Sequence, residues 1–146
     1  PTLEALAHHY ICEGVRLVPM MDAQKGNVYA QEFAWRADGD ALILQEIRSL
    51  AILPLTEVIA GLDNAEQPVI LLGDAMQKKT TLALPANVRL APIHARMPRA
   101  ACVGLAALTR LARGEMDDPV TAAPLYLRRS EAEVLWEKRH GTEAAQ

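Results

Sequence analysis

Two extended apolar segments that lie close together in the sequence constrain the fold most. Residues 15–21 and 28–35 carry the alternating apolar pattern of β-strands, and only six residues separate them. Such a connection is too short for a parallel crossover, so the two strands must be antiparallel. Asp38-Gly39 is then a strong hairpin signal, and Ala41 to Ile47 supplies a third strand. The sequence therefore predicts an antiparallel three-stranded meander.

A helix is predicted before the meander. Its apolar positions recur at helical spacing, Thr2 is a plausible N-cap and Gly14 a plausible stop. These apolar positions are Leu3, Leu6, Ala7, Tyr10 and Ile11.

After the meander, strands and helices alternate. We predict a helix over 54–62, a buried strand over 68–73, a helical turn over 75–79 and a strand over 88–90. The longest helix is predicted over 98–113. Its predicted core face consists of Ala101, Leu105, Leu108 and Ala112. A short extended piece at Leu125–Leu127 and a last helix, opened by a capping box at Ser130–Glu133, complete the chain.

This order of elements predicts an α/β fold. A meander followed by alternating strands and helices implies a mixed five-stranded sheet with helices on both faces, because parallel neighbours need crossover helices. The order β-β-β-α-β-α-β-α is that of a ribonuclease H-like half. With 146 residues, the chain is expected to form a single domain over 1–146, with 115–146 as a C-terminal extension and helix.

Composition narrows the function classes. The chain is 51% hydrophobic and 23% charged, as expected for a globular core-former, and its formal charge of −3 provides no overall cationic field for nucleic acid or anionic membranes. Cys12 and Cys102 lie too far apart in sequence for a disulfide scaffold, so a reducing cytoplasm is expected. We find no membrane span or signal peptide in the sequence. The chain opens at Pro1 without methionine, which suggests a piece of something longer.

The search for catalytic residues gives little. If the first helix continues through Cys12, then Glu4, His8 and Cys12 share one face and offer oxygen, nitrogen and sulfur ligands, but no fourth ligand is evident. The alternative is a polar helix face. Neither a paired-histidine signature nor a catalytic triad is present, and no nucleophile is favoured among Ser49, Ser130 and Cys102, of which Cys102 is expected in the core.

The turn from Asp22 to Asn27 is the best chemical candidate. Converging backbone N–H groups, Lys25 at the tip and Asp22 at the entrance can hold a phosphate or a phosphate-bound magnesium ion. The alternative is a structural hairpin in which Gly26 and Asn27 adopt the positive φ angles of a turn. A second possible nucleotide element is Gly73-Asp74, where a buried strand ends.

Four separated motifs resemble the C-terminal half of the TsaB (YeaZ) family: Thr2–Ala7, Met21–Tyr29, Leu72–Asp74 and Pro124–Arg128. That family usually has Asp-Ala-Arg-x-Gly-Glu-Val-Tyr at the hairpin and Pro-x-Tyr-Leu-Arg near its end. The resemblance keeps the motif order and spans Thr2 to about Gly141.

The resemblance implies an actin/Hsp70-type ATPase fold built from two ribonuclease H-like lobes, of which this chain would be the C-terminal one, with the N-terminal lobe missing. It implies a non-catalytic scaffold, an inactive paralogue of the catalytic subunit, for N6-threonylcarbamoyladenosine modification of tRNA next to the anticodon. The implied partners are a TsaD-like catalytic subunit and a TsaE-like ATPase, with tRNA met indirectly through the complex. A homodimer stays open, and no membrane partner is expected. The scaffold would carry no cofactor of its own, leaving ATP and magnesium to the full complex.

Two departures from the family pattern bear on the hairpin. Gln24 stands where the family prefers arginine, and Asn27 stands where it prefers glutamate. In kinases and chaperones of this fold, the corresponding hairpin contacts nucleotide phosphates. The alternative function is therefore a nucleotide-binding, ATPase-like lobe with a degenerate site, and a glycoprotease-like peptidase is disfavoured. The nucleotide-binding residues would be Asp22, Lys25, Gly26, Asn27, Gly73 and Asp74.

Overall fold

The computed structural model describes residues 2–77, 82–123, 127, 136 and 139. The chain divides into two compact units, residues 1–116 and 117–146, and the first contains all the helices and strands discussed below. The last helix predicted from Ser130 and the extended piece before it lie, apart from single positions, outside the described residues. Within the described ranges, no helix has the length and apolar character needed to cross a membrane.

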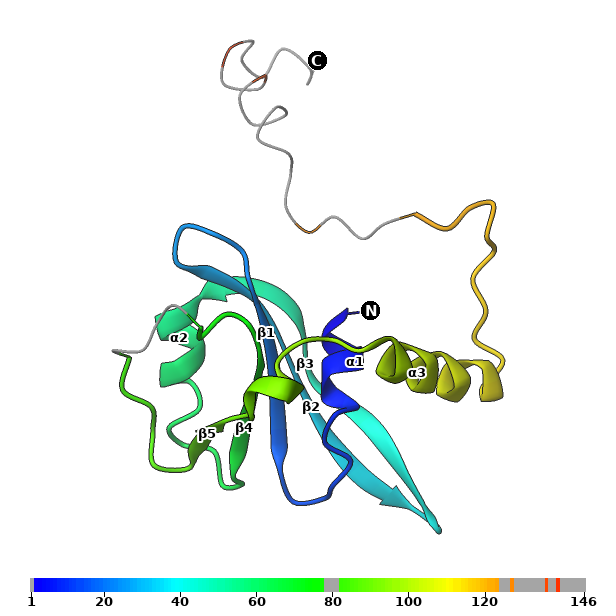
Figure 1. Cartoon of the computed structure of the whole chain (residues 1–146), viewed down its shortest axis with the longest axis horizontal. Coiled ribbons are helices and arrows are strands. Elements are labelled where there is room, and N and C mark those ends of the chain that lie inside the picture. Colours follow the sequence, from blue (N-terminus) through cyan, green and yellow to red (C-terminus); the bar gives the residue numbers. More distant parts are fainter. Residues whose placement is uncertain (1, 78–81, 124–126, 128–135, 137–138, 140–146) are drawn as a thin grey trace, which may run out of the picture. The chain divides into compact units, whose positions relative to one another are not determined.

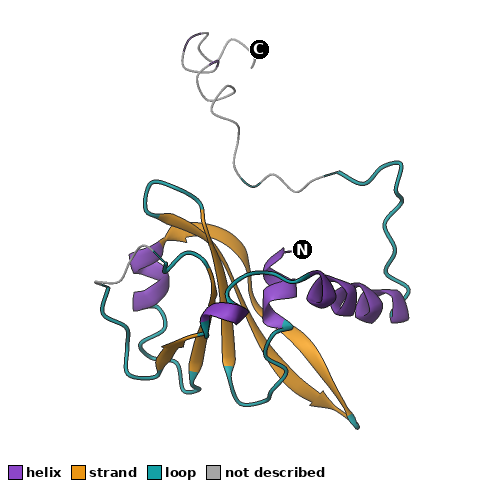
Figure 2. Ribbon diagram, viewed as in Figure 1, coloured by secondary structure: helices purple, strands orange, loops and turns teal. Residues whose placement is uncertain are grey.

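A five-stranded mixed sheet forms the centre of the first unit (Figures 1 and 2). Its strand order is β3-β2-β1-β4-β5. The meander is β1 (Arg16–Asp22), β2 (Asn27–Asp38) and β3 (Ala41–Pro54), and its neighbours are antiparallel. β4 (Val69–Gly73) runs parallel to β1, and β5 (Val88–Leu90) runs parallel to β4. The predicted mixed sheet with a three-stranded meander is thus confirmed.

β3 is longer than predicted. It continues past Ile47 to Pro54, with two register shifts against β2 on either side of Glu32. Ala30 pairs with Ala51 and Glu32 pairs with Arg48. Over this stretch the chain advances by three residues along β3 but by only two along β2. Extra residues of this kind bend a strand without ending its pairing, and the sequence pattern does not reveal them.

Within the described part of residues 1–116, three α-helices and one short 3₁₀-helix accompany the sheet: α1 (Thr2–Ala7), α2 (Leu55–Ala60), α3 (Ala100–Ala112) and η1 (Ile93–Ala95). The prediction that the first helix runs to Gly14 is wrong, because the chain leaves the helix after Ala7. The backbone N–H of His9 donates to Leu6 and that of Tyr10 donates to Ala7, a three-residue spacing that tightens the last turn before the chain departs.

The core has two layers, one on each face of the sheet. Alternate β1 residues divide between them: Val18 and Met20 pack with α2 residues, whereas Leu17 packs with α1 residues. β4 divides in the same way. The α2 layer contains Leu55, Val58, Ile59, Val69 and Leu71, and the α1 layer contains Leu3, Leu6, Ala7, Phe33, Trp35 and Leu72. Helices therefore cover both faces, as predicted.

α3 buries a different face from the predicted one. Ala101, Leu105, Leu108 and Ala112 are exposed, whereas Cys102 and Ala106 are buried. The buried face is the one that meets α1, where Arg110 of α3 forms an ion pair with Glu4. The expectation that Cys102 belongs to the core is confirmed.

Candidate functional site

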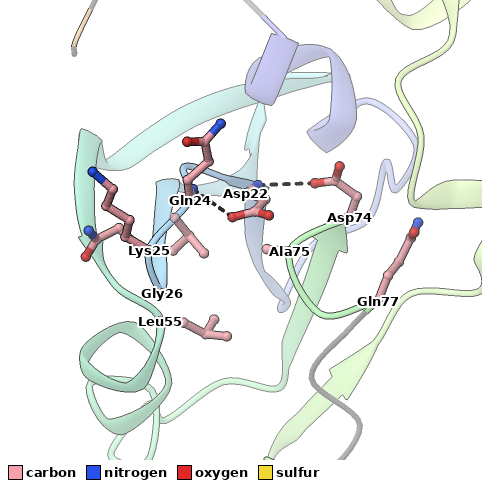
Figure 3. Close-up of a pocket in the computed structure, with 10 residues that line it drawn as sticks. Asp22, Gln24, Lys25, Gly26, Leu55, Asp74, Ala75 and Gln77 are labelled. Carbon is pink, nitrogen blue, oxygen red and sulfur yellow. Dashed lines mark hydrogen bonds between the residues drawn. The ribbon is translucent and has the colours of Figure 1, made fainter. Parts of the chain in front are cut away.

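A cavity of about 410 Å³ lies beside the β1–β2 turn (Figure 3). Three chain segments meet there: the turn itself, the beginning of α2 and the residues that follow β4. The cavity is lined by Asp22, Gln24, Lys25, Gly26, Asn27, Val28, Leu55, Asp74, Ala75 and Gln77. α2 is brought to the turn by a backbone hydrogen bond of 3.0 Å from the N–H of Leu55 to the carbonyl of Gly26.

The backbone of the turn is strongly constrained. Gln24, Lys25 and Gly26 have φ angles of 64°, 54° and 81°, three consecutive residues in the left-handed region. We predicted positive φ at Gly26 and Asn27, which is right for Gly26 and wrong for Asn27. Asn27 is instead the first residue of β2, and its carbonyl accepts from Ala23 N–H at 3.0 Å. Pairing with Pro54 of β3 places Asn27 in the extended strand, so the left-handed residues lie earlier.

Three amides of the turn donate within the turn itself. Ala23 N–H donates to Asn27, Asn27 N–H donates to the carbonyl of Gln24, and Gln24 N–H donates to the Asp22 carboxylate at 2.8 Å. A phosphate cradle needs N–H groups that point at the anion. The turn thus has the geometry of a capped hairpin, with fewer amides left for a ligand than the sequence suggested.

The charges of the cavity come from Asp22, Asp74 and Lys25. One Asp74 oxygen accepts from the backbone N–H of Asp22 at 3.3 Å, so the ends of the parallel neighbours β1 and β4 are tied together. In Figure 3 the Lys25 side chain extends away from Asp74. Two carboxylates and one ammonium group suit a hard cation such as Mg²⁺ with its bound phosphate better than a bare phosphate.

Gly73 does not line the cavity but sets its position. Its φ is 92°, and a β-carbon there would overlap the carbonyl oxygen of Met20 on β1. Only glycine fits this close approach, and Asp74 follows directly. Five of the six predicted nucleotide residues therefore line one cavity, and the sixth supports it. Among the other lining residues, the sequence analysis did not single out Leu55, at the beginning of α2, or Ala75 and Gln77, which follow Asp74.

The structure contradicts the candidate metal-ligand cluster of Glu4, His8 and Cys12. Because α1 ends at Ala7, Cys12 is not on the helix, so the three side chains do not share a helix face. The Glu4 carboxylate accepts from Arg110 Nη2 at 2.7 Å, and His8 Nδ1 lies 3.0 Å from the Glu4 carbonyl oxygen. Among the described residues, no group of three or more potential metal ligands occurs.

Fold and topology together define a ribonuclease H-like lobe with a turn cavity at one end of its sheet. No protein-family model and no curated protein matches the sequence. Two solved structures from Pseudomonas aeruginosa share the fold. One is described as an uncharacterized protein with similarity to peptidase YeaZ; its identity is 24% and its TM-score is 0.63, over 87% of this chain and 56% of that one. The other is YeaZ, with 22% identity and a TM-score of 0.60, over 86% of this chain and 57% of that one.

These likenesses confirm the sequence resemblance at the level of fold. The chain has a YeaZ-like fold, and it spans a little over half the length of both structures.

Proposed function

We propose that this chain is a C-terminal-lobe-like member of the TsaB (YeaZ) family and acts as a non-catalytic scaffold in N6-threonylcarbamoyladenosine modification of tRNA. The observation that carries the proposal is the YeaZ-like fold over 87% of the chain, together with the order of the four sequence motifs. The hairpin motif forms the β1–β2 turn, and Leu72–Asp74 forms the end of β4 beside it.

The geometry of the turn supports a scaffold role over a catalytic one. Three of its amides donate within the turn. Gln24 replaces the arginine that the family prefers, so the site has one fewer cation for an anionic substrate. Under this proposal the chemistry belongs to a TsaD-like catalytic subunit, a TsaE-like ATPase supplies ATP hydrolysis, and tRNA is contacted mainly through these partners. The complex would act in the cytoplasm.

Reconstitution of the modification tests the scaffold role. The protein, its TsaD-like and TsaE-like partners and unmodified tRNA are combined with the substrates, and the modified nucleoside is measured by mass spectrometry. We expect product only when the TsaD-like subunit is present, and we expect Lys25→Ala to retain most of the activity. Modified base formed by this protein without the TsaD-like subunit would contradict the proposal.

Nucleotide binding at the turn is the second candidate. The favouring observation is the tie between Asp22 and Asp74, which places two carboxylates and Lys25 on one cavity of about 410 Å³. Calorimetric titration with ATP and Mg²⁺ tests it, with Asp74→Asn as the site variant and the exposed Asp40→Asn as the matched control. Heat that is lost only in Asp74→Asn would support binding. No heat at millimolar nucleotide would exclude it.

A further inference from the structure

One side of α3 packs against α1, and the opposite side is an exposed apolar face. The side toward α1 carries Cys102, Ala106 and Arg110, which are spaced by four residues. Two residues along an α-helix correspond to about 200° of rotation, so Gly104 and Leu108 lie nearly opposite this row. The exposed face consists of Ala101, Gly104, Leu108 and Leu111. In Figure 1, α3 extends from α1 away from the sheet.

The leucines of this face are well exposed. Leu108 is 63% exposed and Leu111 is 55% exposed. No charged residue occurs from position 100 to position 109. Single exposed apolar residues are common on proteins, but a continuous apolar face on one helix is typical of an interaction site.

Gly104 provides an independent observation. It lies inside α3, where glycine destabilises a helix relative to alanine. A β-carbon at this position would meet nothing within 4 Å, so no neighbour in the described part of the chain requires a glycine. Glycine also allows another chain to approach the backbone closely. The position therefore points to a partner that packs directly over Gly104.

We propose that this face binds the same face of a second copy of the chain, as an antiparallel pair of α3 helices with its two-fold axis at the level of Ala106. Leu108 of each copy then lies over Gly104 of the other, because both positions are two residues from 106. Leu111 likewise lies over Ala101, five residues away on the other side. A large side chain thus meets a small one in every layer, which is how facing helices fill the space between them.

The charges at the two ends of α3 favour this arrangement. Arg96 and Arg99 precede the helix, and its first turn has no acidic residue. The six residues after the helix carry three acidic side chains and one basic one: Arg113, Glu115, Asp117 and Asp118. In an antiparallel pair, the basic end of each helix lies beside the acidic end of the other copy, and the two helix dipoles attract.

The expected dimer is weak. A helix of 13 residues is about 20 Å long, so the pair forms an interface below the standard size, and we expect a Kd on the order of 100 μM. The proposal is independent of the scaffold role.

Sedimentation equilibrium of the whole chain, from about 10 μM to 1 mM, tests the pairing. The average mass should rise with concentration from 15.9 kDa toward twice that value. Gly104→Gln should weaken association at least about tenfold, since its side chain occupies the space that Leu108 of the other copy needs. At low concentration the Tm of this variant should equal or exceed that of the unchanged chain, because glutamine is the better helix former.

Val103→Gln is the matched control. Val103 is also exposed, but it lies about 100° around the helix from Gly104. This variant should leave association unchanged. A mass that stays at 15.9 kDa would overturn the proposal and assign the face to a partner other than a second copy. Unchanged association in Gly104→Gln, or an equal loss in Val103→Gln, would also overturn it. Because the measurement uses this chain alone, failure of the scaffold proposal would not affect it.

Discussion

Replacing Gly73 by alanine should be among the most damaging single changes in the sheet. Gly73 ends β4 opposite Met20 of β1, and its φ of 92° is one that L-residues rarely adopt. A β-carbon would overlap the Met20 carbonyl oxygen and lie 3.0 Å from the carbonyl carbon. Both are backbone atoms, so no side-chain rotation can relieve the contact.

The expected cost has two parts. The left-handed conformation costs a non-glycine residue about 1–2 kcal/mol. Relieving the overlap requires β1 and β4 to separate locally by on the order of 1 Å, and overpacking of this kind costs about 1–3 kcal/mol or more. The sum is about 2–5 kcal/mol. At about 2.1 cal/mol/K of unfolding entropy for each of the 146 residues, this corresponds to a Tm lowered by roughly 7–16 °C.

Gly26→Ala is the matched control. Gly26 has a similar φ of 81°, but a β-carbon there meets nothing within 4 Å. It therefore incurs the conformational cost alone, about 1–2 kcal/mol, or about 3–6 °C in Tm. Thermal and urea unfolding followed by circular dichroism would measure both variants. Equal losses in Gly73→Ala and Gly26→Ala would refute the close approach of β1 and β4 as the reason for glycine at 73.

Three further changes test other parts of the structure. Glu32→Gln removes a carboxylate that is 3% exposed and pairs with two arginines at 3.3 and 3.2 Å. Urea unfolding should show a loss of about 2–3 kcal/mol in the free energy of unfolding. A loss no larger than that of the control Glu57→Gln, at an exposed glutamate, would argue against a stabilising buried ion pair. Ala106 is buried and Leu108 is exposed, so Ala106→Gln should lower the free energy of unfolding by about 2–3 kcal/mol and Leu108→Gln should change it by at most about 0.5 kcal/mol. The reverse order would show that α3 buries its other face. Burial lowers the pKa of His9, so the unfolded state binds more protons and stability should fall as the pH drops below about 6.5. His9→Gln should flatten that pH dependence of Tm, and an unchanged slope would contradict it.

Local pattern predicted β4 and β5 well, but it missed the second half of β3 and predicted the helices less well. β5 was predicted over the residues that form it, and β4 within one residue, because short apolar runs between turn residues have few alternatives. The face of α3 was missed, since almost every residue of this helix is apolar and periodicity then singles out no face. The deciding contact joins Arg110 to Glu4, far apart in the sequence.

The candidate site was predictable where it depends on turn chemistry. Asp22, Lys25 and Gly26 were found because a short apolar-flanked turn with glycine has a recognisable sequence. Asp74 lies beside Asp22 because β1 pairs in parallel with β4. This long-range strand pairing has no local signal in the sequence.

The two register shifts in β3 have a consequence for self-association. β3 is an edge strand of the sheet and runs for 14 residues, many of them aliphatic. A regular strand here would offer a long template for pairing with a strand of another molecule. The extra residues near Arg48 interrupt the regular spacing of amide and carbonyl groups along that rim. An incoming strand can then follow only short stretches on either side. By this argument, the irregular pairing makes edge-to-edge association along β3 less favourable than it would be for a regular strand.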